Sequence, residues 1–243
     1  MSCNRELAAI LIASALFGDM ASAGAQQTGS TWSGYVVQGP ADPFAAAPFT
    51  TFSSVSATWT QPVVDCTTPN ARVSIWVGLD GWGSSTVEQI GTWAVCGSAV
   101  APSYYKAFWE MYAGSQSSGG MAFDLYPGDQ VQASVTYTSA GFVMSIKDNT
   151  TGQNFTTTRA CDASTICYRG SAEWIVERPG GGAYPLADYT EAGFTNLAEQ
   201  SSGPTPTGFI VNMVNKSTGD TLSSCSLIVV YKTALACKWL AAE

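Results

Sequence analysis

The stretch QVQASVTYTSAGFVMSIKDNTTGQNFTTT, residues 130–158, decides the fold class of this chain. Three short runs within it, 130–138, 142–147 and 154–158, are rich in Val, Ile, Thr, Tyr and Phe, the residues that favour β-strands. The segment between the last two runs, 148–153, consists mostly of the turn formers Asp, Asn, Thr and Gly and predicts a hairpin. The stretch therefore predicts three consecutive strands.

The same pattern continues along the rest of the chain. Similar runs, separated by Gly, Pro, Asn and Ser, predict further strands at 54–60, 73–79, 87–95, 105–112, 172–176, 208–213 and 227–231. No segment keeps an apolar period of 3.6 residues, and the most helix-like alternative is 189–199. We expect an all-β sandwich of two antiparallel sheets, formed by one domain over residues 24–243.

The N-terminal segment, residues 1–23, predicts export. It has an early Arg5, an apolar run over residues 7–18 and a small-residue ending, Ala21-Ser22-Ala23, as in secretory signal peptides. The apolar run is shorter than the roughly 20 residues that cross a bilayer as a helix. We therefore expect a secreted protein that is not anchored in a membrane.

Charge narrows the possible partners. The chain has 10 Lys plus Arg against 18 Asp plus Glu, a net charge of -8, and its basic residues are scattered singly. Nucleic acids and anionic membranes require clustered cations. We expect neither partner, and we expect a monomer.

Six cysteines remain after removal of the signal peptide, and the chain has no histidine. An even number of cysteines in an exported chain predicts disulfides, and nearness in sequence suggests 66 with 96, 161 with 167 and 225 with 237, although 15 pairings are possible. The absence of histidine excludes Ser-His-Asp and Cys-His catalysis and histidine-bound zinc or copper. We expect no metal and no cofactor.

Two predicted strands carry polar groups that could do chemistry. Strand alternation places Glu173, Ile175 and Glu177 on one face, where a solvated outer surface is the simpler interpretation. In the other strand Val87, Gln89 and Gly91 share a face, and we expect the glycine to leave space beside the glutamine. A buried amide must be paired, so a Gln beside a cleft is a candidate ligand or catalytic group.

Five motifs together resemble the glutamic peptidases, or eqolisins. They are Trp32-Ser33-Gly34-Tyr35, Trp76-Val77-Gly78-Leu79-Asp80-Gly81, Glu88-Gln89-Ile90-Gly91, Phe108-Trp109-Glu110-Met111-Tyr112 and Ala172-Glu173-Trp174-Ile175-Val176-Glu177-Arg178-Pro179. The resemblance extends from Trp32 to about residue 230, with Phe108 where the family usually has Trp. It implies a concanavalin A-like jelly roll of two curved antiparallel sheets, with a substrate groove across one concave face.

The resemblance also implies the site residues of an acid endopeptidase that acts on proteins or peptides. The catalytic pair would be Gln89 and Glu177, with Glu173 the residue most easily confused with Glu177. The residues expected to line the groove, brace the pair or contact substrate are Gly34, Trp76, Asp80, Gly81, Val87, Glu110, Tyr112 and Glu173.

Amide hydrolysis by this pair has a simple chemical form. Ionised Glu177 would take a proton from the attacking water and return it to the leaving nitrogen, while Gln89 orients the water and stabilises the oxyanion. The alternative function is a carbohydrate-active or carbohydrate-binding sandwich with Glu173 and Glu177 as acid and base. Residues i and i+4 of one strand lie about 13 Å apart, more than the 5 to 9.5 Å that glycosidases use.

Overall fold

The computed structural model describes residues 26–40, 49–97, 103–113, 116–162, 164–228 and 233–242. The predicted signal peptide, residues 1–23, lies outside these residues. Within them the chain is all-β, as predicted, and has no helix. The strands are β1 (Gln27–Gly29), β2 (Trp32–Gln38), β3 (Thr51–Thr60), β4 (Arg72–Asp80), β5 (Thr86–Val95), β6 (Tyr104–Ala113), β7 (Gln116–Leu125), β8 (Gln130–Thr138), β9 (Gly141–Asp148), β10 (Asn154–Arg159), β11 (Ser171–Glu177), β12 (Glu191–Ser202), β13 (Thr207–Val214), β14 (Thr221–Leu227) and β15 (Ala234–Trp239).

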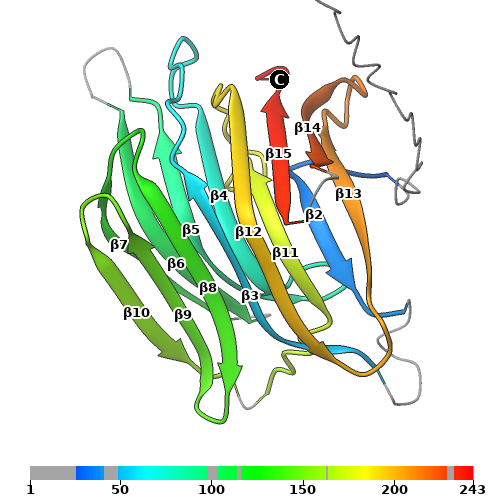
Figure 1. Ribbon diagram of the computed structural model, residues 1–243. Helices are drawn as coiled ribbons and strands as arrows, with labels where there is room; N and C mark the ends of the chain where they lie inside the picture. Colours follow the sequence, from blue (N-terminus) through cyan, green and yellow to red (C-terminus); the bar gives the residue numbers. More distant parts are fainter. Residues whose placement is uncertain are drawn as a thin grey trace, which may run out of the picture.

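The strands form one continuous sheet instead of two separate ones. Its order is β10-β9-β8-β3-β12-β15-β14-β13-β2-β11-β4-β5-β6-β7, and all neighbours on this path are antiparallel, whereas β1 adds to β13 in parallel. The sheet folds back on itself, so that β3, β8 and β9 pack against β4, β5 and β11 (Figure 1). Strands β14 and β15 pair with each other and connect the two layers, so the sheet is continuous from β10 to β7.

The layer that contains β2, β4 and β11 is apolar on both faces. One face contributes Trp174 and Val176 to the main core between the layers. The other face carries a smaller buried cluster of Val36, Trp76, Ile175 and Val211. Because both faces are covered by apolar side chains, polar groups placed among them are held away from bulk water.

Most predicted strands occur where the sequence placed them, with ends that differ by a few residues. The turn 148–153 is confirmed: Asp148 Oδ1 accepts the Thr150 N–H at 2.8 Å, and Gly152 has a φ of 83°. The segment 189–199 is strand, not helix, over most of its length, since it forms the first part of β12. The strand predicted at 227–231 agrees with the structure only at Leu227, where β14 ends; residue 228 is not strand, and residues 229–232 lie outside the described part.

The disulfide pairing expected from nearness in sequence is confirmed for all three pairs. Cys66 pairs with Cys96, Cys161 with Cys167, and Cys225 with Cys237. The last bridge lies in register between β14 and β15, the strands that join the two layers. No helix in the described part of the chain is long and apolar enough to cross a membrane.

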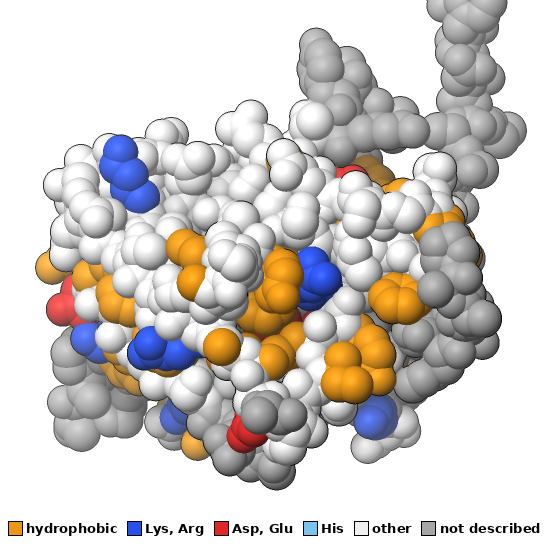
Figure 2. Space-filling model, turned by 90° about the horizontal axis from the view of Figure 1, so that it is seen from below, with side chains coloured by type: hydrophobic (Ala, Val, Ile, Leu, Met, Phe, Trp, Pro, Cys, Tyr) orange, Lys and Arg blue, Asp and Glu red, His pale blue; other side chains and the backbone are white. Residues whose placement is uncertain are grey.

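Basic side chains are dispersed over one face of the molecule (Figure 2). Figure 2 shows them as isolated groups among polar and hydrophobic side chains on one face, with few acidic groups. This agrees with the scattered cations in the sequence.

Candidate active site

Gln89 lies on β5, directly opposite Glu110 on β6. Its Nε2 donates a hydrogen bond to Glu110 Oε2 at 2.9 Å, and the side chain is 6% exposed. Its Oε1 is buried and has no hydrogen-bond partner within the described residues. Because the bond to Glu110 uses one N–H, the amide is fixed in orientation and keeps one acceptor and one donor for a ligand.

Glu177 lies at the end of β11 and is held by Trp76 of β4, whose Nε1 donates to Glu177 Oε2 at 2.8 Å. The indole reaches this position because two glycines lie beneath it. A Cβ on Gly78 would be 2.9 Å from the indole Cζ3, and one on Gly91 would be 2.5 Å from Trp76 Cβ. The expectation that Gly91 leaves space beside Gln89 is therefore wrong, because Trp76 fills that space.

Burial changes the acidity of both carboxyl groups at this site. It raises the pKa of Glu177 to about 7, against the opposing effect of the Trp76 hydrogen bond, and the nearby Glu110 raises it further. Burial also raises the pKa of Glu110, while its bond from Gln89 lowers it. Both groups therefore retain protons in mildly acidic solution to a greater extent than exposed carboxyls would.

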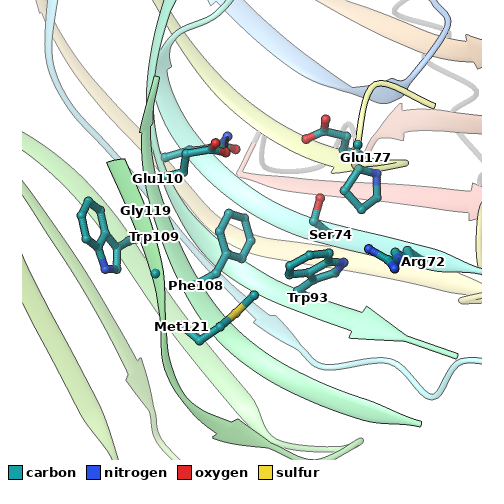
Figure 3. Close-up of a pocket in the computed structure, with 13 residues that line it drawn as sticks. Arg72, Ser74, Trp93, Phe108, Trp109, Glu110, Gly119, Met121 and Glu177 are labelled. Carbon is teal, nitrogen blue, oxygen red and sulfur yellow. Dashed lines mark hydrogen bonds between the residues drawn. The ribbon is translucent and has the colours of Figure 1, made fainter. Parts of the chain in front are cut away.

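Gln89, Glu110 and Glu177 line one cavity of about 440 Å³. Figure 3 shows Glu110 and Glu177 on two sides of it, and Phe108, Trp93 and Arg72 side by side from left to right. The residues that line the cavity are Arg72, Ser74, Gln89, Trp93, Phe108, Trp109, Glu110, Gly119, Gly120, Met121, Glu177, Pro179 and Gly180. The arrangement offers a fixed amide and a carboxyl of raised pKa to one bound molecule.

Glu173 shares the face of Glu177, as alternation predicts, but it is buried and does not line the cavity. Its Oε1 accepts the Trp82 N–H at 2.6 Å and the Ser171 hydroxyl at 2.8 Å. Burial raises the pKa of Glu173 to about 8. The interpretation of this face as a solvated surface is wrong, and the two glutamates lie in different surroundings.

Asp80 and Gly81 belong to the bend that supports Glu173. Asp80 is buried, has a φ of 59°, and accepts the backbone N–H groups of Arg169 at 2.7 Å and Gly170 at 2.8 Å. Burial raises the pKa of Asp80, against these hydrogen bonds. A Cβ on Gly81 would be 2.8 Å from Glu173 Oε2, so the glycine allows the close approach. Asp80 and Gly81 do not line the cavity.

Four other predicted residues also lie outside the cavity lining: Trp76, which holds Glu177, and Gly34, Val87 and Tyr112. Gly34 pairs with Ile175 in the β2–β11 ladder, where a side chain would overlap the Trp174 carbonyl oxygen. Val87 packs against the small apolar cluster, and Tyr112, its partner on β6, is 46% exposed.

Sequence reasoning missed Arg72, Ser74 and Trp93. Strand alternation supplies part of the signal, since Arg72 and Ser74 share the face of Trp76, and Trp93 shares the face of Gln89. Register then brings them together, because Ser74 pairs with both Glu177 and Trp93. The missing information was the pairing of strands distant in sequence.

One group of potential metal ligands occurs in the described part of the chain, formed by Glu88, Cys161 and Cys167. The two cysteines form a disulfide and so offer no thiolate. This group does not fit a metal ion.

Comparison with protein families matches residues 30–239 to the peptidase A4 family. The chain belongs to the peptidase A4 family. The match covers nearly all of the described residues, and membership makes the protein a glutamic-type peptidase, a hydrolase, as the motifs predicted. It also favours this function over the carbohydrate-active alternative.

Solved structures of peptidase A4 relatives have the same fold. Scytalido-glutamic peptidase, solved with a peptide-based transition state analogue, is 24% identical with a TM-score of 0.68, and the alignment covers 87% of this chain and 98% of that one. The eqolisin SCP-B, in complex with the tripeptide Ala-Ile-His, is 23% identical with a TM-score of 0.66 over the same shares. Aspergilloglutamic peptidase from Aspergillus niger is 26% identical with a TM-score of 0.56, over 70% of this chain and 99% of that one. Comparison with curated protein sequences gives no match.

Proposed function

We propose that this member of the peptidase A4 family is a secreted acid endopeptidase in which Gln89 and Glu177 act together on one water molecule. One observation carries the proposal: both side chains line the same cavity, and each is fixed by its own partner, Glu110 or Trp76. Side chains that are already held in position can act on a bound reactant without the free-energy cost of rearranging during the reaction.

The raised pKa of Glu177 determines how the reaction begins. With a pKa of about 7, the protonated form exceeds the ionised form by about a hundredfold at pH 5. The mechanism expected from sequence began with ionised Glu177, and burial makes that form scarce in acid. We therefore start the reaction from the protonated carboxyl group.

In the proposed reaction a carboxylic acid serves as donor and acceptor at once. Glu177 gives its proton to the scissile carbonyl oxygen while the water oxygen attacks the carbonyl carbon, and the other carboxyl oxygen takes a proton from that water. The product is a neutral diol, and Glu177 is again protonated. Glu177 then gives its proton to the leaving nitrogen as the C–N bond breaks, and a diol hydroxyl returns a proton to it.

Gln89 contributes position and a hydrogen bond that does not titrate. Its free Oε1 accepts a hydrogen bond from the attacking water, and its second N–H is available to the scissile carbonyl oxygen while that oxygen takes the proton from Glu177. Loss of one such donor costs about 10²–10³ in kcat in other hydrolases. Glu110 acts as a positioning residue, since it holds the amide in this orientation.

Two further parts of the proposal rest on other features. Export is supported by the signal-like residues 1–23 and by the three disulfides, which persist in oxidising compartments. The jelly-roll description is supported by the folded-back antiparallel sheet, and a peptide substrate by the relatives solved with peptide ligands.

Digestion of a denatured protein at pH 4–5, with the cleavage sites mapped by mass spectrometry, tests the proposal. We expect internal cleavages by the wild type and their loss in Glu177→Gln, with folding verified by circular dichroism. Glu173→Gln is the matched control, because it neutralises a glutamate of the same strand outside the cavity, and we expect it to retain cleavage. Wild-type turnover by Glu177→Gln would contradict the proposal, and loss confined to Glu173→Gln would move the catalytic role to Glu173.

A further inference from the structure

Arg72 lines the cavity from the first position of β4. Its guanidinium Cζ lies 3.4 Å from the ring centroid of Tyr184 and 5.6 Å from that of Trp93 (Figure 3 labels Arg72 and Trp93). Backbone bonds hold the Tyr184 segment beside it: Arg72 N–H donates to the Pro185 oxygen at 2.9 Å, and Ala187 N–H donates to the Arg72 oxygen at 3.0 Å. The aromatic contacts therefore fix the guanidinium group in place.

The charge of Arg72 has no counterion in the described part of the chain. No carboxylate there lies within ion-pair distance of it, and its Nε is buried without a hydrogen-bond partner. A guanidinium that stacks on an aromatic ring keeps its in-plane N–H donors free, and these match a carboxylate in a two-pronged geometry. Arg72 is also the one cation among the residues that line the cavity.

The other charged groups of the cavity do not oppose an anion in acid. Glu110 and Glu177 are the acidic residues of the lining, and burial raises the pKa of both. Burial therefore favours the neutral form of both groups in mildly acidic solution, while an exposed Asp or Glu of a peptide, with a pKa of about 4, is mostly ionised at pH 5. Arg72, by contrast, keeps its full positive charge at this pH.

We propose that Arg72 is a specificity-determining residue that binds a carboxylate of the peptide substrate. The inference rests on the proposed peptidase function and names the substrate group that the cavity selects. Ser74 pairs with Glu177, and Arg72 lies two residues further along the same strand face, about 7 Å away. An extended peptide spans that distance in two residues, so the carboxylate belongs to an Asp or Glu about two residues from the scissile bond, or to the C-terminus of a short peptide.

Binding to the cleavage-impaired Gln89→Ala protein tests the proposal without turnover. The probes are peptides that carry Glu or Gln at each successive position, with either a free or an amidated C-terminus, titrated calorimetrically at pH 5. We expect one Glu position, or the free C-terminus, to bind about tenfold or more tightly than its neutral counterpart, since hydrogen bonds between charged groups are worth this much. Equal affinity for all the charged and neutral peptides would overturn the proposal.

Substitutions of the arginine locate the effect. Arg72→Gln, added to the Gln89→Ala protein, should abolish the preference for the carboxylate peptide and leave the affinity for the neutral peptide nearly unchanged. Arg72→Lys should retain part of the preference. Lys106→Gln is the matched control, because Lys106 is paired with Asp124 and does not line the cavity. A preference that survives Arg72→Gln, or that disappears equally in Lys106→Gln, would contradict the role of Arg72.

Cleavage by the wild type separates this proposal from the one on which it rests. Cleavage sites without any acidic preference, together with equal binding, would overturn the role of Arg72 and leave the peptidase function intact. Carboxylate-selective binding without any cleavage would leave the role of Arg72 intact and overturn the proposed peptidase function.

Discussion

Replacement of Trp76 by Phe should shift the pH dependence of activity in a direction that the site geometry determines. The indole Nε1 donates to Glu177 Oε2 at 2.8 Å, and this bond lowers the pKa of Glu177 because it stabilises the ionised form. A phenyl ring keeps most of the packing over Gly78 and Gly91 but removes the donor. The pKa of Glu177 must therefore rise in the variant.

The magnitude follows from the strength of the lost bond. Hydrogen bonds to charged groups contribute about 1.5–3 kcal/mol, and one pKa unit corresponds to about 1.4 kcal/mol. We expect an upward shift of about one to two units from the value near 7. Because the proposed reaction uses protonated Glu177, the fall of kcat/KM on the alkaline side should move to higher pH by the same amount.

The assay is the pH profile of kcat/KM for a fluorogenic peptide between pH 3 and pH 9. Trp93→Phe is the matched control, since Trp93 lines the same cavity and has no hydrogen bond to Glu177. Its alkaline limb should stay in place. An unchanged or lowered limb in Trp76→Phe, or an equal shift in both variants, would refute the reasoning.

Three further substitutions test other parts of the account. Burial raises the pKa of Glu88 to about 9, so the native state holds a proton that the unfolded state loses above about pH 4.5, and the free energy of unfolding should fall as pH rises towards 9. Urea titrations at pH 4 and pH 8 should show that Glu88→Gln reduces this fall by a few kcal/mol. An identical fall in the wild type and the variant would contradict this expectation. Gly91→Ala should lower the free energy of unfolding by about 1–3 kcal/mol, because the added methyl group would overlap a β4 carbonyl oxygen. Gly193→Ala is the control and should be nearly neutral, because a Cβ there has open space. Equal effects of the two substitutions in urea titrations would exclude the packing explanation. Glu110→Gln should lower kcat more than it raises KM, since an amide replaces the carboxyl group that holds the Gln89 side chain in orientation. A change in KM alone would assign Glu110 to substrate binding instead.

Local sequence patterns predicted nine of the fifteen strands in the described part of the chain, and missed β1, β2, β7, β12, β15 and all but the last residue of β14. Alternation places Glu173 and Glu177 on one face of the strand and Trp174 and Val176 on the other, and in the structure the latter two lie in the main core. It could not reveal that both faces of β11 are covered, because the small apolar cluster is assembled from strands distant in sequence. The solvated-surface interpretation of this face failed for that reason.

The contacts that surround Glu173 and Glu177 could not be predicted from the sequence either. Glu173 differs from Glu177 because the Trp82 N–H and the Ser171 hydroxyl reach it, and such contacts depend on how a turn meets a neighbouring strand. Arg72 was not predicted as a site residue for a related reason. Its position in the cavity follows from the register of β4 with β5 and β11 and from the segment that carries Tyr184.

A double-mutant cycle on Gln89 and Glu177 tests most directly whether the two residues act as one unit on the same water. The measurement is kcat/KM at pH 5 for wild type, Gln89→Ala, Glu177→Gln and the double variant. If the pair acts together, each single change costs at least about 10²-fold and the double variant is no slower, within a few-fold, than the slower single variant. Losses that multiply in the double variant, or near-wild-type activity in either single variant, would contradict the account.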